Sequence, residues 1–363
     1  MILGTLGRYF GAVFLRWIGG LFLGAALLVF LIDVLELMRT RLDDAPEAFL
    51  GLLAVSALRV PLIMEQVLPF AVLIGSIAAF VSLSRRSELA VARASGLSVW
   101  QFAAPGVALA LALGVLATTV YNPAAVAMKV ASDRLAGELV GRAASILSEQ
   151  SSESWLRQRT AEGDAILWVG GVADGGTTVI DPVAWQFDKD GRLERRIEAP
   201  VGRLGEGTWI FERATVVDTD GTPRREAEFR LPTALTPDQV RGRFASPDSV
   251  SFWALPGTIG RAAASGLPPY RFRLQFHALL SRPLLLAAMV LIAATVSLGS
   301  ARSGGTGRMI LGGVVAGFML YVITEIARDL GSEGLVPAAL AAWAPAVVAT
   351  WLGSTVLLFR EDG

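Results

Sequence analysis

The sequence predicts a membrane α-helical protein with six transmembrane helices, three before and three after an inserted all-β domain of jellyroll-like type. Apolar residues make up 53% of the 363 residues and charged residues 18%, whereas roughly a quarter of an average soluble domain is charged. The apolar residues collect in long blocks, which is typical of a chain that crosses a bilayer. Between the third and fourth blocks, short alternating runs separated by glycine-containing turns indicate strands.

The composition excludes several classes of function. The 32 basic and 32 acidic residues balance, so no basic excess favours nucleic-acid binding. The chain has no cysteine, which removes disulfides, thiolate metal sites and cysteine nucleophiles. Its single histidine, His277, leaves little material for a metal site or a Ser/His relay, and we interpret it as an interfacial residue. We therefore expect no catalytic residue, no metal and no cofactor.

Six apolar blocks reach the length of about 20 residues that a helix needs to cross the hydrocarbon core. They are Gly11–Ile32, Val60–Val81, Phe102–Tyr121, Leu279–Leu298, Met309–Ile326 and Leu335–Phe359. The first contains one charge, Arg16, and the second contains one, Glu65. The fourth has Arg282 and Pro283 near its start, so its first residue is left open between Gln275 and Pro283.

The arginines of the short loops predict the orientation of the chain. Those on one side are Arg8, Arg85, Arg86, Arg93, Arg302, Arg308 and Arg360. The other side carries the insert and the acidic residues Asp43, Asp44, Asp329 and Glu333. Arg39 and Arg41 are mild exceptions on that side, so we expect both termini in the cytoplasm and the middle domain opposite. A cleaved signal peptide in residues 1–32 is a weak rival, because no clear small-x-small cleavage site leads into a soluble chain.

The insert is predicted to be a sandwich, jellyroll or similar open β fold, because short strands recur at regular spacing. The expected strands are Trp155–Arg157, Ile166–Val169, Thr178–Phe187, Leu193–Val201, Trp209–Val217 and Ala227–Leu231. Asp190-Gly191 and Asp220-Gly221 between them are strong hairpin signals. Trp168, Trp185 and Trp209 are interpreted as core residues, with a binding platform as the less favoured alternative.

The chain divides into three parts. Residues 1–122 hold the first three spans, residues 123–270 the insert, and residues 271–363 the last three spans. The insert opens with a helix-compatible link that extends to about Gln150, because charged residues recur along it at helical spacing. A short helix is expected after Pro247, where the chain turns back toward the membrane.

The basic loop between the second and third spans contains a candidate surface helix. Ser87 is a suitable N-cap and Gly96 a suitable stop around a helix-favouring run. Arg86, Leu89 and Arg93 follow at i, i+3 and i+7, so one face offers two guanidiniums around an apolar side chain. Such a face can dock into a groove of a cytosolic partner, or the arginines can serve only as a topological anchor. The residues alone leave both alternatives open.

The same loop resembles that of a known family. The run Arg85-Arg86-Ser87-Glu88-Leu89 followed by Ala94-Ser95-Gly96 closely resembles the coupling-helix signature of the lipopolysaccharide-export ABC transporter permeases, LptF and LptG. The resemblance covers nearly the whole chain, and it includes Arg8-Tyr9, Pro61, Pro69, Leu235-Thr236-Pro237-Asp238, Gly317-Phe318 and Tyr321. It is closer to the G type than to the F type through Ser-Glu-Leu, Trp155 and the hairpin Asp188–Arg192.

The resemblance implies a transport function. Permeases of this family form a heterodimer, LptF with LptG, above two copies of the ATPase LptB in the bacterial inner membrane. They extract lipopolysaccharide from that membrane and pass it through periplasmic jellyroll domains to a bridge of LptC-like and LptA-like proteins. They hold no nucleotide site, and this sequence likewise lacks a Gly-x-x-x-x-Gly-Lys-Ser/Thr run.

The resemblance also implies roles for residues of the basic loop. Residues 84–95 would form the coupling helix. Glu88 would be the carboxylate that meets a basic residue of the ATPase, and Arg86, Leu89 and Arg93 would flank it. The loop that fixes the topology would therefore also carry the ATPase contact.

Lipid contacts are implied around the first span, where basic side chains of the family meet phosphorylated headgroups. Arginine suits phosphate because it donates bidentate hydrogen bonds. This sequence departs from the family at Phe30, Glu36 and Leu62, where related chains can carry lysine. The candidates that can supply the charge instead are Arg39, Arg41, Arg59 and Arg134.

Two further features lie in the fifth span. Glu325 and Arg328 stand at i, i+3, which favours an intrahelical ion pair over a lipid contact. Gly313 and Gly317 form a small-x-x-x-small face suited to close helix packing. In the family the fifth span faces the partner's first span at the gate, so packing and gating can coincide at these glycines.

Two rival functions differ from a transport subunit. A membrane enzyme would require paired carboxylates or a His/Asp cluster at one membrane depth, which the single histidine and the scattered acids do not supply. A membrane scaffold or sensor would bind a ligand with its periplasmic domain and would have no ATPase partner. Co-purification with a cytosolic ATPase and a second permease separates transport from both.

Overall fold

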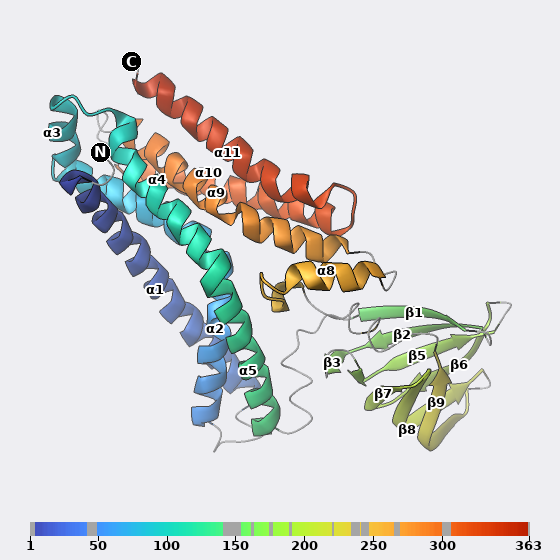
Figure 1. The fold of residues 1–363 in the computed structure, drawn as a ribbon. Helices are drawn as coiled ribbons and strands as arrows, with labels where there is room; N and C mark the ends of the chain where they lie inside the picture. The colour runs from blue at the N-terminus through green and yellow to red at the C-terminus, as the bar shows by residue number, and fades with distance from the viewer. Residues whose placement is uncertain are drawn as a thin grey trace.

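The computed structural model describes most of the chain (Figure 1). The described residues are 4–41, 49–140, 154–160, 163–173, 177–188, 191–219, 221–233, 240, 247–264, 269–299 and 306–361. Asp43, Asp44, Arg302 and the run from Leu235 to Asp238 lie outside them. Arg41 and Arg308 are described in their backbone only.

Six helices of the described ranges are long and apolar enough to cross a membrane, which confirms the predicted number of spans. They are α1 (Thr5–Arg41), α2 (Phe49–Arg85), α4 (Val99–Leu116) continued by η2 (Ala117–Tyr121) and α5 (Asn122–Val140), α9 (Tyr270–Gly299), α10 (Thr306–Ser332) and α11 (Ala338–Glu361). The β insert follows α5 and precedes α9 (Figure 1), so the predicted arrangement of three spans on each side of it is confirmed.

The third span is one continuous helical run. α4 passes through the short π-helix η2 into α5, so the boundary we expected between residues 122 and 123 falls inside a helix. Pro123 lies just beyond η2. Proline has no N–H to donate to the carbonyl four positions earlier, so the regular α-helical ladder is interrupted here. Farther along α5, Lys129 Nζ lies 2.6 Å from Asp133 Oδ2 on the next turn.

The fourth span starts earlier than either residue that the sequence left open. α9 begins at Tyr270 and continues through Pro283. Gly114 of α4 lies against this proline, and a Cβ built on Gly114 would come within 2.3 Å of Pro283 Cα. The backbones of α4 and α9 therefore approach each other closely because residue 114 has no side chain.

Aromatic and aliphatic side chains fill the core of the helical bundle. Phe14 of α1, Phe80 of α2 and Phe102 of α4 are at most 1% exposed, and the rings of Phe14 and Phe80 meet edge to face at 5.0 Å. α9 lies at the centre, since 67% of its most apolar segment is buried inside the chain, whereas 11% of the corresponding segment of α1 is buried. α1 is thus a peripheral helix and α9 the central one.

The insert is an antiparallel sheet that curls on itself around one long strand. Its strands are β1 (Ser154–Thr160), β2 (Gly163–Val169), β3 (Gly171–Ala173), β4 (Thr178–Ile180), β5 (Val183–Phe187), β6 (Leu193–Glu198), β7 (Val201–Gly205), β8 (Thr208–Asp218) and β9 (Pro223–Pro232). The first half of β8 pairs with β7 and its second half pairs with β6. β9 covers the other edge of β8 along its length.

Two of the expected strands are each split by a proline. The run Thr178–Phe187 forms β4 and β5 with Pro182 between them, and Leu193–Val201 is broken before Pro200. The two breaks lie side by side, because the amide that precedes each proline donates to the carbonyl of the other proline at 3.1 Å. A proline cannot donate to a strand ladder, so both strands turn at the same place and the sheet curls there.

The tryptophans of the insert lie on two different faces of the sheet. Trp209 is 0% exposed in the interior, which confirms its predicted place in the core. The core interpretation is wrong for Trp168 and Trp185, which are half-buried on the outer face because side chains alternate along a strand. Trp155 is 64% exposed and stacks on Trp185 with ring centroids 5.5 Å apart.

The return from the insert to the membrane contains two short helices. The 3-10 turn η4 (Pro247–Ser249) and the helix α8 (Leu255–Ala264) precede α9, where the sequence predicted a short helix after Pro247. Leu255 and Ala262 of α8 pack with Phe272 and Leu279 of α9. The return segment is thereby anchored to the central helix.

The substitution Gly114→Ala tests the close contact between α4 and α9. The added methyl group would meet the backbone of Pro283, and overpacking of this kind costs about 1–3 kcal/mol. We expect a lower unfolding temperature for the purified chain in detergent. Gly19→Ala of α1 is the control, because nothing lies within 4 Å of its added Cβ; equal unfolding temperatures for the two variants would contradict the packing argument.

Candidate functional site

The basic loop between α2 and α4 forms the short helix α3 (Glu88–Ala94). Gly96 ends it with φ 85°, and its N–H donates to Arg93 O while the N–H of Leu97 donates to Ala92 O. This is the Schellman pattern that glycine favours, so the predicted stop is confirmed. Ser87 occupies the N-cap position, but its φ is 60° and its side chain makes no cap hydrogen bond, so the predicted side-chain cap is wrong.

The faces of α3 differ from the pattern that the sequence indicated. Leu89 and Ala92 are 6% exposed, and Leu89 packs into the core of the bundle instead of standing between two arginines on an outer face. Arg86 and Arg93 are exposed, and the Arg93 guanidinium lies 5.9 Å from the ring centre of Phe102. The exposed large apolar residue of α3 is Val91, at 68%.

Glu88 is half-buried at the start of α3. Tyr9 of α1 donates its phenolic hydrogen to Glu88 Oε1 over 3.1 Å. The other oxygen, Oε2, is enclosed and has no hydrogen-bond partner among the described residues. Sequence spacing could not reveal this contact, since 79 positions separate the two residues.

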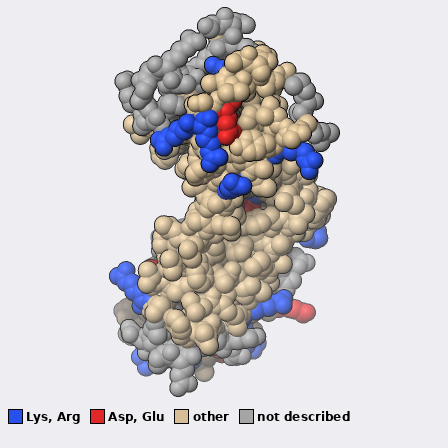
Figure 2. Space-filling model, turned by 90° about the vertical axis from the view of Figure 1, so that its left-hand side faces the viewer, with Lys and Arg blue, Asp and Glu red and all other residues tan. Residues whose placement is uncertain are grey.

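Charged side chains gather at the end of the molecule that carries α3. In Figure 2, basic and acidic side chains lie near the upper end, and a broad band of uncharged surface separates them from a second, lower group of charges. An uncharged band between two charged zones is what a bilayer requires of the surface that it covers. Figure 1 places both chain ends beside α3 and the β domain away from it.

The arginines proposed for headgroup binding come from three helices. Arg39 of α1 and Arg134 of α5 are exposed. Arg59 of α2 is partly neutralised, because its Nη1 lies 3.7 Å from Asp33 Oδ1. The side chain of Arg41 is outside the described part of the chain.

The glycine face of α10 packs inside this chain. A Cβ on Gly317 would lie 2.0 Å from Leu73 Cδ2, and one on Gly313 would lie 2.6 Å from Ile77 Cδ1. Both contacts are with α2, so the glycines face the second span of the same chain and not an open surface. Exposed side chains on α10 include Leu311, Val315, Phe318 and Met319. Arg328 and Glu325 form the predicted ion pair, with 3.5 Å between Nη1 and Oε1.

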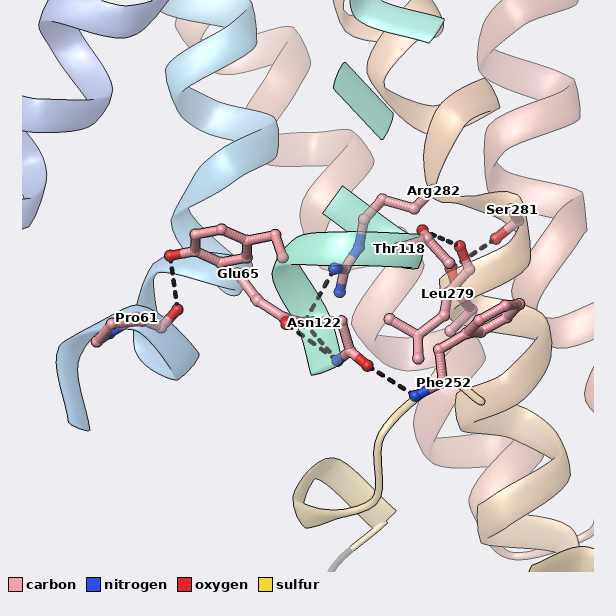
Figure 3. A network of polar contacts seen from close by, with 10 residues as sticks. Pro61, Glu65, Thr118, Asn122, Phe252, Leu279, Ser281 and Arg282 are labelled. Carbon is pink, nitrogen blue, oxygen red and sulfur yellow. Dashed lines mark hydrogen bonds and ion pairs between the residues drawn. The ribbon is translucent and has the colours of Figure 1, made fainter. Parts of the chain in front are cut away.

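A buried polar cluster joins three spans, and sequence reasoning missed it (Figure 3). Arg282 Nη1 of α9 lies 2.9 Å from Glu65 Oε2 of α2, and the two residues are 8% and 6% exposed. Asn122, at 0% exposure, donates from Nδ2 to both carboxylate oxygens of Glu65, at 2.9 and 3.2 Å. A lone acid and a lone base in two apolar spans were the signal that could have found this pair.

The surroundings of the cluster add bonds between helices. Tyr121 donates from its hydroxyl to Pro61 O over 2.9 Å, and Thr118 donates to Leu279 O over 2.7 Å. A small cavity between α2, α9 and α10 is lined by both ion pairs, Glu65 with Arg282 and Glu325 with Arg328. Among the described residues, no group of three or more His, Asp or Glu side chains could hold a metal ion.

The chain is similar to known proteins over almost its full length. The family described as lipopolysaccharide export system permease LptF/LptG matches residues 8–359. The LptG protein of Haemophilus influenzae is 26% identical over 300 residues, which cover 81% of each chain. The LptG protein of Escherichia coli K12 is 26% identical over 379 aligned positions, which cover 99% of each chain. The chain therefore belongs to the LptF/LptG family of lipopolysaccharide export permeases and resembles its LptG members.

Proposed function

We propose that this chain is the LptG-like subunit of an ABC transporter that extracts lipopolysaccharide from the bacterial inner membrane and passes it to a periplasmic bridge. Its energy comes from ATP hydrolysis in separate cytosolic LptB-like subunits. The observation that carries this proposal is the short helix α3, which presents Glu88 at the charged end of a six-span bundle. The second permease is LptF-like, and the bridge consists of LptC-like and LptA-like proteins.

The orientation of the chain follows from the same arrangement. Both termini and α3 lie together at one end of the bundle, and the β insert lies away from them (Figure 1). Arg85, Arg86 and Arg93, which lie in and just before α3, favour the cytoplasmic side. This supports a cytoplasmic position for both termini and a periplasmic position for the insert.

The coupling contact is formed by Glu88 and the exposed arginines beside it. A guanidinium of the ATPase that displaces the Tyr9 hydroxyl from Glu88 Oε1 is a suitable partner for the carboxylate, because charge-assisted hydrogen bonds are short and strong. Arg86 and Arg93 frame the contact from the exposed side of α3. Leu89 transmits the movement of the ATPase from α3 to the spans, because its burial in the bundle core makes α3 move together with α2 and α4.

Lipid and partner contacts are assigned to the least covered helices. In α1 and α10, 11% and 22% of the most apolar segment is buried, against 50% in α2. Exposed leucines follow one face of α1 at Leu23, Leu27 and Leu31. Arg39 and Arg134 supply charge near this side for phosphorylated headgroups, with Arg59 held partly by Asp33.

The substitution Glu88→Ala should abolish ATP-driven lipid release in proteoliposomes that contain the two permeases and the ATPase. It removes the acceptor for the ATPase cation, so the ATPase should also lose its stimulation by the permeases. Glu333→Gln, an exposed carboxylate between α10 and α11, is the control and should retain both activities. Normal transport by an intact Glu88→Ala complex would reject this role, and failure of the wild-type chain to co-purify with an ATPase would favour the scaffold or sensor alternative.

The substitution Leu89→Ala should loosen α3 from the bundle. Truncation of a buried leucine costs about 2–5 kcal/mol, and the loss falls on the joint between α3 and the core. We expect faster proteolysis in the loop around α3 and reduced coupling of ATP hydrolysis to lipid release. Val91→Ala, at an exposed position of the same helix, should change neither; equal effects at both positions would count against anchoring by Leu89.

A photo-crosslinking amino acid in place of Arg39 or Arg134 should label lipopolysaccharide in the assembled complex. These positions are exposed, and the expected labelling requires that the headgroup passes within reach of the side chain. The same amino acid in place of Val91, which is exposed on α3 at the opposite end of the bundle, serves as the comparison and should label no lipopolysaccharide. Labelling confined to the partner permease would remove both arginines from the proposed headgroup path.

A further inference from the structure

The β insert is connected to the bundle by two chain segments, and these segments meet at one buried position. The outgoing segment is α5, which begins at Asn122. The incoming segment contains Phe252 and Trp253 and leads through α8 into α9. The N–H of Phe252 donates to Asn122 Oδ1 over 2.8 Å, as Figure 3 shows.

A second hydrogen bond between the return segment and the third span uses a carbonyl that a proline leaves free. Pro123 lacks the N–H that would donate to Thr119 O in an α-helix. The indole Nε1–H of Trp253 donates to this carbonyl over 3.0 Å. Two consecutive residues of the return segment, Phe252 and Trp253, are therefore hydrogen-bonded to the third span. In addition, the ring of Phe252 stacks on Phe276 of α9 with centroids 5.5 Å apart.

Asn122 connects this contact between the return segment and the third span, which we call the joint, to the buried charges. Its amide oxygen accepts from the return segment, and its amide nitrogen donates to Glu65, which is paired with Arg282. A buried ion pair tolerates little displacement, because loss of a partner leaves an uncompensated charge. Movement of the return segment away from Asn122 would therefore disturb the pair that joins α2 to α9.

We propose that Asn122 is a positioning residue that ties the return segment of the β insert to the Glu65–Arg282 pair. Through this joint, the return segment and the second, third and fourth spans move together during lipid hand-off. The effect on transport rests on the proposed function. The joint itself can be measured independently of lipid transport, in the assembled complex.

Asn122→Leu removes both hydrogen-bonding groups while keeping the number and branching of the side-chain heavy atoms. Without its acceptor, the Phe252 amide should exchange with deuterium about tenfold faster. Peptide-resolved exchange of the purified complex measures this directly. In proteoliposomes, ATP hydrolysis should continue while the amount of lipid released per ATP falls severalfold.

The matched control is Ser132→Ala. Ser132 is 1% exposed on α5 and donates to Val55 O of α2 over 2.8 Å, so this variant also loses a buried bond between the second and third spans. It does not touch the return segment, so neither the exchange of Phe252 nor the lipid released per ATP should change. Equal behaviour of the two variants would overturn the proposal, because a general loss of packing would then explain both.

A charge exchange keeps the proposal testable if Asn122→Leu fails to fold. Asn122→Asp alone places two carboxylates against each other and should open the joint. The double variant Asn122→Asp/Glu65→Gln restores one acid, one amide and one guanidinium at the same place, and it should recover slow exchange at Phe252. Absence of recovery would overturn the proposal. If the wild-type complex releases no lipid, the proposed function fails, and the exchange measurements still decide whether the joint exists.

Discussion

The ion pair between Glu65 and Arg282 is the constraint on which the arrangement of the spans depends. Each residue is the one charge within the apolar block of its span, and such charges are costly within a bilayer unless they are paired. Pairing requires α2 and α9 to meet at this level. A shift of α9 by one turn, about 5.4 Å, would leave both charges unpaired, so the pair fixes the register of these helices. Asn122 then fixes the third span, because it donates to the same carboxylate.

Two prolines leave backbone carbonyls free to accept hydrogen bonds from neighbouring segments in this region. Pro123 and Pro283 cannot donate to the carbonyls four residues earlier, which belong to Thr119 and Leu279. Both carbonyls accept hydrogen bonds from outside their own helix, one from Trp253 and one from Thr118. A proline inside a span thus creates an acceptor for a neighbouring segment, and within a membrane such an acceptor is filled by protein because no water is available. The same two residues that weaken their helices therefore help to join them.

The sequence predicts the parts of this structure that depend on local composition. Apolar blocks identify the six spans because bilayer thickness sets their length, and Gly96 marks the end of α3 because its backbone conformation favours glycine. The missed features depend on contacts between distant residues. Glu65 and Arg282 are 217 positions apart, and the inward direction of Leu89 depends on how α3 lies against the bundle. Trp168 and Trp185 were assigned to the wrong face because hydrophobicity alone does not tell which face of a strand is inside.

The packing differences among the helices explain how one chain can serve both ends of a transporter. The helix α3, for which we propose the ATPase contact, and the return segment of the insert are both fixed to the well-buried helices, through Leu89 at one end and Phe252 at the other. Force applied to α3 can therefore reach the return segment at Phe252 through α2, α4 and α9. α1 and α10 have the least buried apolar segments of the six spans, although Tyr9 of α1 bonds to Glu88 and the glycines of α10 pack on α2. Their exposed outer faces can therefore change their lateral contacts with lipid or a second permease while their inner faces stay packed on the core.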